Sequence, residues 1–144
     1  MGPLEMTKTE REEFLAGLHV GILSVEHPGH PPLAVPMWYA VVEGEVLFNT
    51  GGSSRKARLL QQAGRATLTV QTETPPYQYV SVQGPVTISR ERRPDHDLLF
   101  AHRYLGPKLG ARYAERNPPG PDDVLVHLRP ERWSTTDFGK LSTR

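Results

Sequence analysis

Short apolar stretches rich in β-branched residues recur along the chain, and Gly, Pro, Asn and Asp separate them. This pattern is typical of strands joined by tight turns. The clearest turn runs from His27 to Pro32 and contains three prolines and a glycine, and Glu43-Gly44-Glu45 forms a second. Six stretches are therefore predicted to be strands: 18–25, 33–42, 46–50, 66–71, 77–89 and 124–129.

Helical segments are fewer and short. Thr9 and Glu12 form a capping-box pattern, in which each side chain can bond the other residue's free N–H, so we expect a helix over 10–16 that stops at Gly17. Further helices are predicted over 56–62, 95–104 and 108–115, the last two split by Gly106-Pro107. The fold expected from these elements is mainly β with short helices, a six-stranded antiparallel barrel.

Two prolines inside predicted strands mark irregular positions. Pro36 removes a backbone donor, so its strand should lie at a sheet edge, at a bulge, or where something other than a strand runs alongside. Gly84-Pro85 indicates a bulge or bend in the strand over 77–89.

The stretch from Phe48 to Ala57 concentrates groups that bind anions. A predicted strand ends in Thr50, two glycines and two serines, and Arg55 and Lys56 then begin a helix. Backbone N–H groups, hydroxyls, the positive end of the helix dipole and two cations can all point at one phosphate. The plainer interpretation is a turn in which Ser53 or Ser54 is the helix N-cap and the two cations face water.

Composition excludes several classes of protein. The chain has 144 residues, which we assign to one domain (1–144) with a disordered tail over 1–8. The net charge of +1 argues against a dedicated nucleic-acid binder, and the absence of Cys excludes a disulfide framework or a thiolate nucleophile. No apolar run is long enough to cross a bilayer, and no apolar signal-peptide core follows Met1, so we expect a cytoplasmic protein.

Histidines and aromatics give weaker signals. His27 and His30 lie in a Pro/Gly turn with no carboxylate or third His nearby, so we expect no metal site. Trp38 follows Pro36-Met37 and is either a core aromatic or part of a backbone stretch that faces a flat ligand. Trp133 is either a lid or an anchor for the C-terminal segment.

The order of these features resembles the pyridoxamine 5'-phosphate oxidase-like, flavin-binding split-barrel superfamily over about residues 9–140. The resemblance rests on Pro-Met-Trp-Tyr (36–39), on the 48–57 segment with its Ser-Arg-Lys, and on Tyr-x-Tyr-Val-x-Val-x-Gly (77–84). The closing segments 128–133 and 137–140 are most similar to members that use the deazaflavin coenzyme F420. The Arg-rich end of true pyridoxamine phosphate oxidases is absent.

The resemblance implies particular roles for residues. It implies that the cofactor phosphate is held by Thr50, Ser53, Ser54, Arg55 and Lys56. It also implies that the ring lies against the backbone of Val35, Pro36, Met37 and Trp38. Gln78 or Tyr79 would reach the cofactor from the other subunit of a homodimer, with two cofactor sites at the interface.

The expected function is an F420-dependent oxidoreductase that transfers a hydride between deazaflavin and an electron-poor small organic molecule. One alternative is an FMN-dependent oxidoreductase of the same fold, since both cofactors carry a ribityl phosphate. Another is a non-catalytic flavin, deazaflavin or haem binder, although no His is placed convincingly as a haem ligand. Beyond its phosphate F420 carries an oligoglutamate tail, for which Arg58, Arg65 and Lys108 are candidate partners. No residue stands out as the catalytic acid.

Overall fold

The computed structural model describes residues 2–90 and 94–143. Within them the helices are α1 (Lys8–Ala16), α2 (Arg55–Ala63), α3 (Pro94–Arg116) and the 3-10 helix η1 (Phe138–Thr143). The strands are β1 (Gly21–Val25), β2 (Leu33–Met37), β3 (Ala40–Val42), β4 (Glu45–Gly51), β5 (Arg65–Gln71), β6 (Gln78–Ser89), β7 (Asp123–Leu128) and β8 (Arg132–Asp137).

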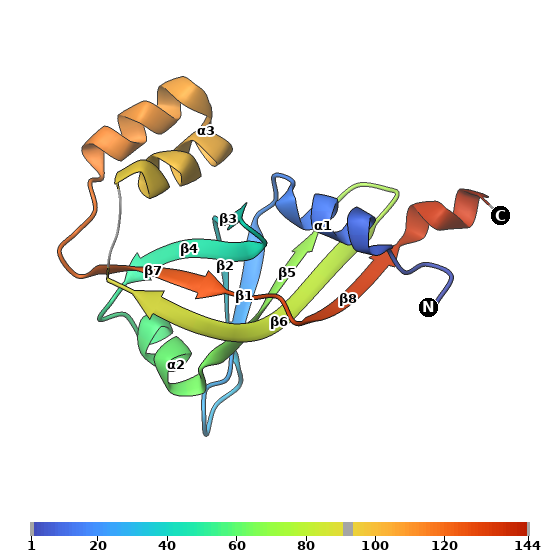
Figure 1. Cartoon of the computed structure of the whole chain (residues 1–144), viewed down its shortest axis with the longest axis horizontal. Helices are drawn as coiled ribbons and strands as arrows, with labels where there is room; N and C mark the ends of the chain where they lie inside the picture. Colours follow the sequence, from blue (N-terminus) through green and yellow to red (C-terminus); the bar gives the residue numbers. More distant parts are fainter. Residues whose placement is uncertain (1, 91–93, 144) are drawn as a thin grey trace.

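The strands form one curled antiparallel sheet (Figure 1), in the order β2-β1-β5-β6-β7-β4-β3, with β8 also paired to β6. Side chains alternate across it, because successive residues of a strand point to opposite faces. The buried side chains form a main core, whose largest fully buried members are Tyr39, Phe48, Leu23, Leu60, Leu68 and Leu128, and a smaller cluster of Ala40, Leu47, Phe100 and Leu125. The mainly β, antiparallel split-barrel class expected from the sequence is confirmed.

The predicted strand count of six was too low, since the described residues form eight. The predicted strand over 33–42 is two strands, because the chain leaves the ladder at Trp38 and Tyr39. The segment after Pro130 is also a strand, β8, whose residues Arg132–Asp137 pair with Gln83–Gln78 of β6. This pairing is between distant parts of the chain, and its mixed polar sequence gives little local strand signal.

Gly84 marks the bend of the barrel. Strand β6 pairs with β8 up to Gln83 and with β5 up to Pro85, and from Val86 onward it pairs with β7. A Cβ at position 84 would overlap the carbonyl oxygen of Arg129, so the close passage of the two chains requires glycine. The bend predicted at Gly84-Pro85 is therefore present, and it lets one long strand belong to both halves of the barrel.

The N-terminal segment is packed rather than loose, which corrects the disordered tail expected over residues 1–8 for the part from Leu4 onward. The Asp137 N–H donates to the Leu4 carbonyl at 2.8 Å, Met6 is buried, and both chain ends lie at the same end of the molecule (Figure 1). The helix begins two residues earlier than predicted, with Thr7 as N-cap and Glu10 completing the capping box. Both Thr7–Glu10 and Thr9–Glu12 satisfy the sequence pattern. The contacts of residues 4–6 with β8 and η1 favour the first of them.

Helix α3 lies at the end of the molecule away from the two chain ends (Figure 1) and is two helical pieces joined at Gly106, which has φ 81°. This matches the predicted split. Two side chains of its first piece fix it to the barrel. Arg103 donates to the carbonyls of Tyr39 and Gly17, both at 3.2 Å, and the Tyr104 hydroxyl donates to the His19 carbonyl at 2.5 Å.

Strand β2 ends the sheet order and pairs only with β1 among the described residues. Pro36 therefore lies in an edge strand, one of the three settings expected from its position in the sequence. Among the described residues no helix has the length and apolar character needed to cross a membrane.

Candidate functional site

The turn between β4 and α2 brings together the residues predicted to bind phosphate. Ser54 is the N-cap of α2: its Oγ accepts from the Ala57 N–H at 3.1 Å and donates to the Gly51 carbonyl at 2.7 Å. The Thr50 hydroxyl lies 3.3 Å from the Ser54 hydroxyl. The plainer interpretation is thus correct for Ser54, which caps the helix through the Ala57 N–H, whereas the N–H groups of Arg55 and Lys56, in the first turn, have no intrahelical acceptor.

A residue from a distant part of the chain closes this turn. The Gly52 N–H donates to the Asp122 carbonyl at 2.7 Å, and the Ser53 N–H donates to Oδ2 of the same residue at 2.8 Å. The Ser53 hydroxyl bonds that carboxylate oxygen too. Hydrogen bonds from Ser53 hold the pKa of Asp122 below its usual range. The turn's N–H groups, which the sequence suggested for a phosphate, are thus engaged within the protein.

The two cations that follow the turn differ in exposure. Arg55 is exposed, whereas Lys56 is half-buried, and burial lowers the pKa of the Lys56 ammonium. Among the described residues Lys56 takes part in no ion pair. A partly desolvated ammonium without a carboxylate favours the approach of an anion, since an anion would restore the lost solvation.

The 35–38 stretch lies at the sheet edge. Val35 packs against the core, Met37 is buried and Pro36 is exposed. Trp38, half-buried, stacks on Tyr104 of α3 with ring centroids 5.0 Å apart and an interplanar angle of 3°. Its ring is thus held by an aromatic partner at the barrel rim rather than buried in the centre of the core.

A cavity of about 350 Å³ connects Trp38 to the phosphate turn. Its lining combines aromatic and proline residues (Trp38, Tyr113, Pro118 and Pro119) with glycine and polar residues (Asn49, Thr50, Gly51, Asp97, Asn117 and Asp123). The Asn49 amide donates to Asp97 at 2.8 Å, which ties β4 to α3. Of the residues that the sequence predicted to be functional, Trp38 and Thr50 line this cavity, whereas 35–37 and 53–56 do not.

Gln78 does not join them within one chain. It opens β6 beside Asp137, near α1 and the chain ends, whereas the turn and α2 lie at the other end of the sheet (Figure 1). Its backbone N–H donates to the Thr72 hydroxyl at 2.9 Å. Tyr79, the other residue considered for this role, is more exposed and lies on the outer face of the sheet.

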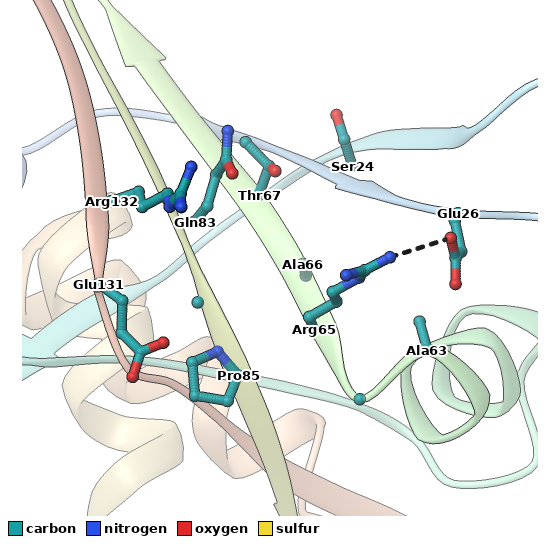
Figure 2. A pocket seen from close by; sticks show the side chains of 12 residues that line it. Ser24, Glu26, Ala63, Arg65, Ala66, Thr67, Gln83, Pro85, Glu131 and Arg132 are labelled. Carbon is teal, nitrogen blue, oxygen red and sulfur yellow. Dashed lines mark ion pairs between the residues drawn. The ribbon is translucent and has the colours of Figure 1, made fainter.

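A larger groove of about 850 Å³ lies beyond the C-terminal end of α2. Figure 2 shows Thr67, Gln83 and Arg132 in one row across β5, β6 and β8, and Arg65 paired with Glu26 at 3.6 Å. None of the predicted phosphate residues lines this groove. It does contain Arg65, one of the cations considered for an anionic tail.

Two parts of the site had no signal in the sequence. Asp122 lies 69 positions from Ser53, in a loop of prolines and glycines, and nothing local indicates its contact with the turn. The tyrosines of α3 that border Trp38 also come from a distant segment. Trp133, by contrast, is an anchor: it lies half-buried in β8 under the guanidinium of Arg11, 4.6 Å from the ring centroid. Among the described residues no group of three His, Cys, Asp or Glu side chains could hold a metal ion.

The curled antiparallel barrel, with a cation-bearing helix start directly after β4, defines a split-barrel protein. The family model for pyridoxamine 5'-phosphate oxidase matches residues 7–137, and the chain belongs to that family. Among proteins of curated function, none matches.

Several solved structures share the fold. A conserved hypothetical protein of Mycobacterium tuberculosis is 24% identical, with a TM-score of 0.78, and the match covers 99% of this chain and 91% of that one. An F420 reductase is 25% identical, with a TM-score of 0.71, over 85% of this chain and 94% of its own. An FMN-binding, pyridoxamine 5'-phosphate oxidase-related protein of Nostoc punctiforme is 19% identical, with a TM-score of 0.60, over 90% and 79%.

Proposed function

We propose that this protein is an F420-dependent oxidoreductase that transfers a hydride between deazaflavin and an electron-poor small organic molecule. One observation carries the proposal: Arg55 and the half-buried Lys56 open α2 directly after β4, in a family whose solved relatives include an F420 reductase and an FMN-binding protein.

The residues fit a ribityl phosphate. Lys56 would supply a point charge and Arg55 a planar pair of donors, and the N–H groups of Arg55 and Lys56, which have no intrahelical acceptor in the first turn of α2, would add donors to the same oxygens. Thr50 would contribute its hydroxyl from the end of β4. The flat ring would lie against the edge backbone of 35–38, where β2 has no second strand neighbour among the described residues.

Bound F420 would supply the redox chemistry, a hydride exchanged at carbon 5 of its ring. The chain's part is to anchor the phosphate, orient the ring and shield one of its faces. The cavity that joins Trp38 to the turn is the space in which a small acceptor would meet the ring. The polar residues that line this cavity would orient that acceptor.

The cations of α2 favour F420 over the alternative, FMN. Arg58 follows Arg55 by three residues on the exposed face of α2, and Arg65 begins the next strand. The positive charges of both Arg55 and Arg58 act on His27. Nine helical residues span roughly 13 Å, so these cations continue away from the phosphate turn, where an oligoglutamate tail would run and FMN has nothing. Lys108, the third candidate, lies on α3.

We further propose a homodimer with a cofactor site at each end of the interface. The outer face of the sheet carries small and mostly uncharged side chains in two rows: one row is Pro36, Ile22, Thr69, Ser81 and Ser134, and the next is Ala34, Ser24, Thr67, Gln83 and Arg132. A second chain on this face would bring its own Gln78 or Tyr79 toward the site, which one chain cannot do because those residues lie at the other end of its sheet.

Titration of the protein with FMN, F420 and haem, each followed by absorption or fluorescence, tests the cofactor assignment. Lys56→Ala should weaken binding of the preferred cofactor by about 1–3 kcal/mol, the usual value for a hydrogen bond to a charged group. The double change with Arg55→Ala should cost more. Lys8→Ala, which removes an exposed cation paired only within α1, is the matched control and should change nothing. Unchanged affinity in a double variant with native circular dichroism would refute the assignment.

A further inference from the structure

Asp122 holds the phosphate turn in two different ways. Its main-chain carbonyl accepts from Gly52 at 2.7 Å, and a Cβ at position 52 would lie 2.5 Å from that oxygen, so this attachment depends on glycine. Its carboxylate accepts from both donors of Ser53, the N–H and the hydroxyl. The bond to Gly52 joins two main chains, whereas the bonds to Ser53 depend only on the rotamer of the Asp122 side chain.

The carboxylate occupies the position that an incoming anion would need at this turn. Ser53 carries two donors, and both point at a single carboxylate oxygen. Two anions cannot share them, because each would lose its hydrogen bonds and repel the other. Both residues are exposed, so a ligand can reach them without any movement of the core.

We propose that the Asp122 carboxylate is an internal competitor for the phosphate, and that a phosphate reaches Ser53 only when this side chain rotates away. The proposal rests on the proposed cofactor site and adds to it a residue that sets its affinity. Rotation frees two donors and leaves the Gly52 attachment in place, so the turn keeps its shape. Arg90, whose positive charge already acts on Asp122, offers the released carboxylate a new partner. Arg55 and Lys56 attract the ligand phosphate in either case.

Two variants test this inference with FMN, F420 and inorganic phosphate as probes. Asp122→Asn keeps an oxygen that can accept from Ser53 but removes the charge, and Asp122→Ala removes the competitor. Both should bind the phosphate-bearing ligand more tightly, by about tenfold for Asp122→Ala, which corresponds to one hydrogen bond to a charged group. Glu73→Gln, an exposed carboxylate in another turn, controls for the change in net charge.

A second measurement separates competition from a general charge effect. The amide ¹⁵N–¹H resonance of Ser53 should shift when phosphate or cofactor is added, and the gain from Asp122→Asn should shrink when Ser53→Ala is also present. Equal or weaker binding by both Asp122 variants would overturn the inference. So would a Ser53 amide that no phosphate-bearing probe perturbs.

These outcomes remain distinct from failure of the proposed function. If the protein binds F420 tightly while the Ser53 amide resonance does not shift, the cofactor assignment stands and competition by Asp122 is refuted. If the protein binds only inorganic phosphate, with a shift of the Ser53 resonance and tighter phosphate binding in Asp122→Ala, competition by Asp122 stands and the oxidoreductase assignment is refuted.

Discussion

Among the residues proposed to bind the phosphate, Lys56 is the one whose pKa is shifted by its surroundings. Burial lowers its pKa, so it loses its proton at a lower pH than an exposed lysine. If it holds the phosphate, affinity should fall as pH rises through this lowered pKa, by up to about tenfold per pH unit, because the neutral amine no longer attracts the anion. Cofactor dissociation constants measured between pH 7 and 10.5 test this prediction.

Lys56→Arg is the control for that profile. Arginine stays charged over the whole range, so the variant should show a flat profile even if its affinity at pH 7 is changed. The phosphate itself is fully ionised above pH 7 and adds no slope. Parallel profiles for the two proteins would show that Lys56 does not contact the anion.

At this scale the sequence predicted which residue types gather at the turn, but not how they bond. Ser54 as N-cap follows from local rules that relate a hydroxyl to the N–H groups of the next helical turn. The engagement of Ser53 by Asp122 depends on where the loop before β7 passes, which only the assembled sheet determines. Local chemistry was therefore predictable, and the long-range partner was not.

Helix α1 is fixed to the other end of the chain by a charged contact. The Lys140 ammonium lies 2.7 Å from a carboxylate oxygen of Glu10 and also donates to the Glu5 carbonyl at 2.9 Å. The bond from Lys140, followed by that from the Thr7 N–H, lowers the pKa of Glu10 to about 2. This contact should stabilise the fold at pH values above the ordinary glutamate pKa, and the stabilisation should disappear as pH falls from about 5 toward 2.

Glu10→Gln isolates this charge, because glutamine can keep the capping bond to Thr7. Thermal unfolding should show a lower Tm for the variant above pH 5 and a shrinking difference at more acidic pH. Glu12→Gln removes a carboxylate that pairs only with Lys8 within α1, so it should have little effect at any pH. A Glu10→Gln difference that is the same at pH 3 and pH 7 would contradict the prediction.

Most elements were predictable because their signals are local. The helix over 55–63 and the strands over 65–71 and 78–89 lie within a residue or two of their predicted bounds. The elements predicted wrongly are those whose presence or bounds depend on tertiary contacts. Strand β8 exists because β6 pairs with it, and the break at Trp38 and Tyr39 coincides with Arg103 and Tyr104 of α3 bonding the Tyr39 backbone.

In the proposed homodimer, the outer face of the sheet is the surface through which the two chains would associate. Ile22 lies in its row of small side chains between Pro36 and Thr69. We expect light scattering to give twice the 16.1 kDa of one chain. Ile22→Glu should produce a folded monomer with weakened cofactor binding, because it buries an unpaired charge in the interface. Val42→Glu places the same change at an exposed position of β3, outside these rows, and should stay dimeric. A monomeric parent that binds cofactor tightly would refute the interface site.

The last prediction separates the two cofactors at the level of the whole protein. FMN supports one-electron steps and can therefore react with oxygen, whereas a deazaflavin has carbon in place of nitrogen at position 5 and is largely restricted to hydride transfer. With equal FMN and F420, the protein should retain F420 preferentially, and reduced F420 should persist in air until an acceptor is added. Arg58→Ala should reduce the preference for F420 while leaving FMN affinity nearly unchanged, since Arg58 lies beyond the phosphate turn, along the path proposed for the tail. Tight binding of FMN with no measurable binding of F420 in the competition would establish the FMN-dependent alternative.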